Sequence, residues 1–256
     1  MRNLSKSNPS IGMPKYIFWM SLCLAFFSGM TGWAFGSGAS HGENLSNNFI
    51  AMSGLFLCVF SVLSFFISMI FRWDWQSKHF GVFCVPFSTV SSFGIYPALC
   101  FYYYGTCPVY IRIVLLIANV VLILWWCCRF LLVYRKIMSL PEFSSLLYVE
   151  EDDANYYLQK NDIMILEKKL KFEQLPAGIL LGGPMLLAVF LVPFYSVVSK
   201  YAGIPFPHIF LAIFAIPIEL MCLGLVTRGI LVFFYYPSII ARRTKKPVYV
   251  DLVSKK

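Results

Sequence analysis

Glu219 is the residue in this sequence whose type and position could most directly do chemistry. It lies about eleven residues into a long apolar run, and so roughly 16 Å along a helix that rises 1.5 Å per residue. A carboxylate at that depth of a bilayer is costly, and such residues often belong to ion or proton pathways. The alternative is a neutral or hydrogen-bonded glutamate that holds neighbouring helices together. Glu219 is therefore a candidate binding or transport residue, with both interpretations open.

Two arginines in apolar runs, Arg129 and Arg228, could bind a lipid phosphate. Both are expected near the inner ends of helices that could touch, although snorkelling to the headgroups would explain each arginine alone. Arg228 cannot pair with Glu219 along one helix, because nine residues separate them by about 13 Å. We treat both arginines as candidates for contact with lipid headgroups.

Cys100 and Cys107 lie close together beside one predicted outer connection, and they could form a disulfide in an oxidising compartment. Most other cysteines lie within apolar runs, where they behave as small hydrophobic residues. The three histidines are scattered, and the sequence has no hydrolase, nucleotide-binding or zinc-protease motif. We therefore expect no catalytic residue, no metal and no cofactor.

Long apolar runs must position these residues. Of the 256 residues, 59% are hydrophobic and 13% are charged, whereas soluble domains have about 45–50% and about 25%. Runs of about 20 apolar residues match a bilayer core of about 30 Å. The expected fold is an all-α, polytopic bundle of helices in a cell membrane. The net charge of +9 gathers beside the apolar runs, which favours a lipid bilayer over nucleic acid as its partner.

Six apolar runs predict six transmembrane helices, four in residues 1–134 and a two-helix hairpin in residues 175–241. The third run contains Ser, Gly and Pro, and is expected inside the bundle or beside a cavity, and not against lipid. The last run would be kinked at Pro217 and followed by an aromatic turn. Gly32 and Gly36 are spaced for close helix packing. The expected spans are 16–36, 49–71, 80–104, 109–134, 175–198 and 208–231.

The remaining segments are a soluble insert, residues 135–174, and a basic tail, residues 242–256. If both termini are cytoplasmic, 17 of the 21 Lys and Arg residues lie on the inner side and two on the outer, which favours this orientation. Within the insert, residues 162–172 have the pattern of an amphipathic helix. A cleaved signal peptide is the alternative for the first run, but that run exceeds the 7–15 residues of a typical signal core.

The insert carries the leading functional hypothesis. It is the only soluble segment long enough to present a specific surface, and it contains an acidic block that could dock a protein partner. The chain would then be an accessory subunit of a membrane assembly, or a protective (immunity-type) membrane protein. The main alternative is a small solute or ion transporter using Glu219, because interrupted helices often frame a substrate site. A lipid-modifying enzyme is the third class. The acidic block comprises Glu150, Glu151, Asp152 and Asp153.

Overall fold

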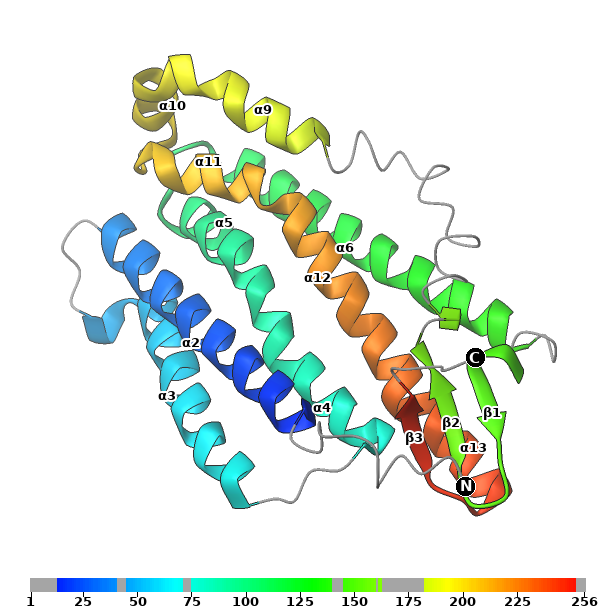
Figure 1. Ribbon diagram of the computed structural model, residues 1–256. Helices are drawn as coiled ribbons and strands as arrows, with labels where there is room; N and C mark the ends of the chain where they lie inside the picture. The colour runs from blue at the N-terminus through cyan, green and yellow to red at the C-terminus, as the bar shows by residue number, and fades with distance from the viewer. Residues whose placement is uncertain are drawn as a thin grey trace.

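The chain folds into a bundle of long helices with a small β-sheet at one end (Figure 1). The computed structural model describes residues 13–40, 45–70, 75–139, 145–159, 161–162 and 182–251. In chain order the elements are α2 (Met13–Ala39), η1 (Leu45–Asn47), α3 (Phe49–Ile70), α4 (Ser77–Ser88), η2 (Thr89–Ser91), α5 (Ser92–Tyr104), α6 (Val109–Met138), β1 (Tyr148–Glu150), β2 (Asn155–Leu158), α9 (Gly183–Leu191), η4 (Val192–Phe194), α10 (Tyr195–Ala202), α11 (Phe206–Phe214), α12 (Ile216–Gly229), η5 (Ile230–Tyr235), α13 (Tyr236–Thr244) and β3 (Val248–Asp251).

Five helical segments in the described part of the chain are long and apolar enough to cross a membrane. They confirm the predicted class of fold, a mostly helical protein with several apolar helices suited to a lipid bilayer. The predicted amphipathic helix lies outside the described residues except for its first residue, Asp162. The five segments are Lys15–Ala39, Phe49–Phe66, Val109–Met138, Gly183–Ala202 and Ile216–Thr244.

The predicted third span is not one of these five, because it forms two shorter helices. The 12-residue α4 and the 13-residue α5 are joined by the single 3₁₀ turn η2. Hydroxyl groups around this break donate to backbone carbonyls, as when Thr89 donates to Pro86 and Ser91 to Ser88. These bonds give additional donors to carbonyls at the point where the α-helix changes to a 3₁₀ turn. The segment lies between α2 and α12 (Figure 1).

Helices α2 and α3 pack so closely that their backbones touch. A Cβ atom placed on Gly54 of α3 would lie 2.4 Å from the backbone nitrogen of Trp33 and 2.5 Å from the carbonyl oxygen of Gly29, both in α2. Gly32 and Gly36, which the sequence predicted to allow close helix packing, contact different neighbours. Gly36 meets the backbone of Ala51 in α3, whereas Gly32 meets the ring of Tyr96 in α5.

The final apolar run differs from its prediction in two places. Helix α11 ends at Phe214 and α12 begins at Ile216, so the break lies at Ala215, beside the predicted kink at Pro217. Proline has no backbone N–H to continue the helical ladder, which accounts for the position. The prediction of an aromatic turn after this span is wrong. The chain stays helical through the π-helical segment η5 and through α13 to Thr244.

A three-stranded sheet, which the sequence did not indicate, joins the insert to the tail. Its order is β1-β2-β3, with β1 and β2 antiparallel and β2 and β3 parallel. The strands have only three or four residues, so their alternation is too short to read from the sequence. We call the end of the bundle that carries the sheet the sheet end. The opposite end, with the connections after α5 and α10, is the loop end.

One apolar core is continuous from the membrane helices into the sheet. It combines residues of α4, α6 and α12 with residues of η5, α13 and the three strands. The sheet is therefore packed onto the helices as part of one unit and is not a separate domain. The buried residues of this core are Phe80, Trp126, Phe130, Tyr134, Ile137, Leu147, Tyr148, Tyr157, Leu220, Leu231, Val232, Phe233, Tyr236, Val248 and Val250.

Candidate functional site

A buried polar cluster lies where the sheet meets the membrane helices. Arg228, in the last turn of α12, donates from Nε to the Asp162 carboxylate at 2.9 Å and forms an ion pair with it. Tyr134 of α6 donates to the other carboxylate oxygen at 2.8 Å. Tyr157 of β2 donates to the same oxygen as Arg228. We call these four residues the Arg228 cluster.

The Arg228 cluster contains a buried ion pair, which makes it important for holding the elements together. Asp162 is fully buried and the Arg228 side chain is 14% exposed, so each charge needs the other. Burial raises the pKa of Tyr157, and the Asp162 carboxylate raises that pKa further, so the hydroxyl keeps its proton and donates. Both oxygens of the carboxylate accept hydrogen bonds. The cluster thus ties α6, α12 and the sheet together at one point.

A second bond joins the sheet to the π-helical segment. The hydroxyl of Tyr148, in β1, donates to the backbone carbonyl of Val232 in η5 at 2.7 Å. A π-helical turn displaces the regular i→i−4 ladder, so carbonyls in it need other donors. Burial also raises the pKa of Tyr148, which keeps its hydroxyl in the donating form. The sheet therefore supplies a hydrogen-bond donor to the irregular helix, and this bond fixes the sheet against η5.

The acidic block forms the turn of the β1–β2 hairpin. Glu150 pairs with Asn155 in the strand register, and the backbone N–H of Glu151 donates to Ala154. Lys246, just after α13, binds the Glu150 carboxylate and the Glu151 carbonyl, each at 2.9 Å. Asp152 and Asp153 are exposed, and neither forms an ion pair with any residue that the structure describes. The turn is thus fixed at its base and leaves two carboxylates in solvent.

Glu219 lies in the first turn of α12, directly after the break at Ala215. It is 2% exposed, and its Oε1 atom has no hydrogen-bond partner among the residues that the structure describes. A Cβ atom placed on Gly94 of α5 would lie 3.2 Å from its other carboxylate oxygen, so the two helices meet at this residue. No hydrogen bond of the Glu219 side chain is found within the described residues, so its hydrogen-bonded structural role stays a prediction.

The other residues singled out in the sequence are spread over the bundle. Cys100 and Cys107 are free cysteines in separate apolar clusters, so the disulfide considered for them is not formed in this structure. The guanidinium of Arg129 lies 5.3 Å from the ring centre of Trp125, a cation–π distance. Arg228 has an internal partner in Asp162, and its contact with lipid headgroups stays a prediction.

Asp162 and the two tyrosines of the Arg228 cluster were not predicted as site residues from the sequence. One signal was present, because an arginine within an apolar run needs a partner and Glu219 had been excluded on distance. The spacing of acidic residues in the insert does not single out Asp162, which is 66 residues from Arg228 in the chain. Asp162 becomes the partner of Arg228 because the insert folds back against α12.

Comparisons with known proteins do not extend this description. No protein-family model matches the chain, and no curated protein or solved structure is significantly similar to it.

Proposed function

We propose that the chain crosses the cell membrane six times, with the sheet end and both termini in the cytoplasm. The sixth crossing is the interrupted segment α4–η2–α5. Its residues 77–104 would extend about 42 Å at 1.5 Å per residue, which exceeds a hydrocarbon core of about 30 Å. The charge asymmetry supports the orientation, because most Lys and Arg residues of the sequence lie in segments assigned to the cytoplasm.

Reporter fusions test this topology. A reporter that is active only in the cytoplasm is expected to give signal when fused after Lys256 or inserted at residue 140, and none after Asn47. Each fusion is compared with the same reporter attached to a periplasmic or secreted control. Signal after Asn47, or silence at Lys256, would contradict the six-crossing arrangement.

We further propose that the protein acts by binding a protein partner, and not by catalysis, through the acidic turn of the β1–β2 hairpin. The partner would be another component of a membrane assembly or, for a protective protein, a membrane-directed toxin. The observation that carries this proposal is the anchoring of the hairpin. Its turn is held at the base by Lys246 and at its strands by the Arg228 cluster and Tyr148.

This anchoring supports binding for an energetic reason. A flexible acidic loop would lose conformational entropy when a partner ordered it, and that loss weakens association. The anchored turn has already lost this freedom on folding, and it presents Asp152 and Asp153 without internal ion pairs among the described residues. Two exposed carboxylates in a fixed position favour a partner with a basic surface, and they accelerate its association.

Charge reversal tests the proposed partner surface. The double variant Asp152→Lys/Asp153→Lys is expected to lose the partner that co-purifies stoichiometrically with the wild-type protein in mild detergent. Binding by the wild type is expected to weaken as salt rises toward 1 M, because exposed charges are screened. The measurement is the ratio of partner to bait, with membrane insertion checked in parallel.

Glu150→Gln is the matched control for charge reversal. It removes one negative charge from the same hairpin but keeps an oxygen that can accept a hydrogen bond from Lys246. The bond from Lys246 to the Glu151 carbonyl and both free carboxylates of the turn also remain. We expect it to retain most of the partner. Full recovery of the partner with the charge-reversed turn would exclude the hairpin as the binding surface.

A second function, ion or proton transport, is favoured by one specific observation. Glu219 is buried at a helix break in mid-bundle, and its Oε1 atom lacks a hydrogen-bond partner within the described part of the chain. An uncompensated buried polar atom costs about 1–3 kcal/mol, so a glutamate that serves only stability would not be expected here. The amino end of a half-helix within a bundle is also a position where transporters bind ions and substrates.

Substitution of Glu219 separates stability from function. Glu219→Leu is expected to leave the free energy of unfolding unchanged, or to raise it by about 1–3 kcal/mol, because it removes a polar atom that has no partner. If Glu219 carries protons or cations, Glu219→Gln would abolish flux into liposomes and Glu219→Asp would retain part of it. Unchanged partner binding by all three variants supports binding as the function. A large loss of stability in Glu219→Leu would show that the carboxyl group is structural.

A further inference from the structure

The break between α11 and α12 places the buried Glu219 carboxylate beside a second interrupted segment. Side chains on a helix point back toward its amino end, so Glu219 extends along α12 toward Ala215. A Cβ atom placed on Gly94 of α5 would lie 3.1 Å from the Ala215 Cβ and 3.2 Å from a carboxylate oxygen of Glu219. The carboxylate therefore lies where the break in one membrane helix meets α5.

The charge of this carboxylate is not neutralised by any residue that the structure describes. Its Oε1 atom has no hydrogen-bond partner there, and none of the ion pairs between described residues includes Glu219. Arg228, on the same helix, is already paired with Asp162. Glu219 is also the only Asp or Glu in the five membrane-crossing segments and in the segment α4–η2–α5. An ionised carboxylate buried in this way needs a counter-charge, and one positive charge is sufficient.

Backbone carbonyls beside this carboxylate can supply further oxygen atoms. Pro97 has no N–H, so the carbonyl of Phe93, the residue before Gly94, lacks the donor that a regular helix would give it. Helix α11 ends at Phe214, and its carboxyl end brings partial negative charge to the break. The amino end of α12 favours the ionised form of Glu219. Carbonyls at interrupted helices and the carboxyl ends of half-helices are the groups that coordinate cations in membrane transporters.

We propose that Glu219 binds one alkali-metal cation, Na⁺ or K⁺, where α5 crosses the break between α11 and α12. The carboxylate supplies the negative charge, and backbone carbonyls that include that of Phe93 supply neutral oxygen ligands. A divalent cation would leave one positive charge uncompensated within the membrane, which is costly. The close approach of Gly94 to Ala215 favours a small ion over an organic cation. The inference rests on the second proposed function, because both assign Glu219 a role with ions, and it names the ion.

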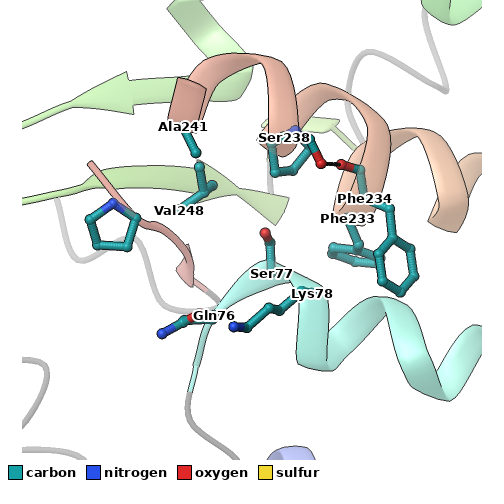
Figure 2. A pocket seen from close by; sticks show the side chains of 10 residues that line it. Gln76, Ser77, Lys78, Phe233, Phe234, Ser238, Ala241 and Val248 are labelled. Carbon is teal, nitrogen blue, oxygen red and sulfur yellow. Dashed lines mark hydrogen bonds between the residues drawn. The ribbon is translucent and has the colours of Figure 1, made fainter. Parts of the chain in front are cut away.

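A cavity at the sheet end provides a comparison for this site. It lies between the start of α4, the helical segments η5 and α13, and the start of β3, and its volume is about 170 Å³ (Figure 2). Lys78 is part of its lining, and no Asp or Glu is among the described residues that line it. The lysine would repel a metal cation, so we expect no cation to bind in this cavity. A change there serves as a control for binding at Glu219.

Equilibrium binding by the purified full-length protein in a neutral detergent tests the proposal. The protein is titrated with NaCl or KCl, while choline chloride keeps the ionic strength constant, and the bound metal ion and the thermal midpoint are measured. We expect saturable binding of one Na⁺ or K⁺ per chain. The thermal midpoint is expected to rise with the concentration of that ion, because a ligand that binds only the folded state stabilises it. Choline and Mg²⁺ are expected to have neither effect.

Variants locate the bound ion. Glu219→Gln removes the charge but keeps the shape of the side chain, and it is expected to abolish saturable binding. Pro97→Ala restores an N–H that competes for the Phe93 carbonyl, and it is expected to weaken Kd by about two- to tenfold, the effect of one hydrogen bond. Two controls should bind as the wild type does. Asp153→Asn removes an exposed carboxylate of the hairpin, and Ala241→Leu narrows the cavity at the sheet end.

Flux measurements in liposomes separate this inference from the proposal of transport. Cation binding that requires Glu219, without flux of that cation, supports the site and contradicts transport. Proton flux that requires Glu219, without binding of Na⁺ or K⁺, overturns the inference and leaves proton transport as the function. Wild-type affinity in Glu219→Gln or in Pro97→Ala would also overturn it. So would a loss of binding in Asp153→Asn equal to that in Glu219→Gln, because the ions would then respond only to the general negative charge.

Discussion

Replacing Asp162 with alanine is expected to lower the free energy of unfolding by about 3–5 kcal/mol, since it leaves a buried arginine without its counter-charge. The side chain of Arg228 is only 14% exposed, so little water can replace the lost carboxylate. The hydroxyls of Tyr134 and Tyr157 would lose their acceptor in the same step. Denaturant titration in mixed micelles, followed by circular dichroism, measures the change.

The neighbouring residue Asn161 supplies the control for this prediction. Its side chain donates one hydrogen bond to the Leu146 carbonyl, so Asn161→Ala is expected to cost only about 0.5–1.5 kcal/mol. The double variant Asp162→Asn/Arg228→Gln should lose less stability than the sum of its single variants, because it leaves no unpaired charge. Equal effects of Asp162→Ala and Asn161→Ala would mean that the Arg228 cluster does not hold the sheet.

Adding a single methyl group at Gly54 is expected to destabilise the protein by about 1–3 kcal/mol. The new Cβ would lie 2.4 Å from the Trp33 nitrogen and 2.5 Å from the Gly29 oxygen. Both are backbone atoms, so no side-chain rotation can relieve the overlap and α2 must move away from α3. Gly54→Ala would therefore lower the thermal midpoint in detergent, and Gly54→Val would lower it further.

Gly182→Ala is the matched control for Gly54→Ala. No atom of the described residues lies within 4 Å of a Cβ placed on Gly182, and its backbone angles of φ −89° and ψ −35° suit alanine. We expect this change to be neutral or to stabilise by about 0.4–1 kcal/mol, because alanine restricts the unfolded chain more than glycine does. A similar loss of stability in both alanine variants would contradict the close approach of α2 and α3.

The sequence by itself determined the class of fold and the course of most helices. A run such as Phe49–Phe66 must satisfy its backbone hydrogen bonds within itself in lipid, so its helical state follows from local composition alone. The expected second span, 49–71, begins at the first residue of the observed helix Phe49–Ile70, and its last residue lies outside the described residues. The unusual composition of the third run likewise indicated an interrupted segment inside the bundle.

Only the tertiary structure decided which distant residues meet. The parallel pairing of β2 with β3 joins Asn155 to Val248, and the ion pair joins Asp162 to Arg228. Strands of three or four residues and single charges carry no periodic signal. The sequence alone therefore does not distinguish the observed strand pairs and ion pair from many other possible ones. The choice among them depends on how the insert folds back against α6 and η5, where burying a charge or a hydroxyl is tolerable only beside its partner.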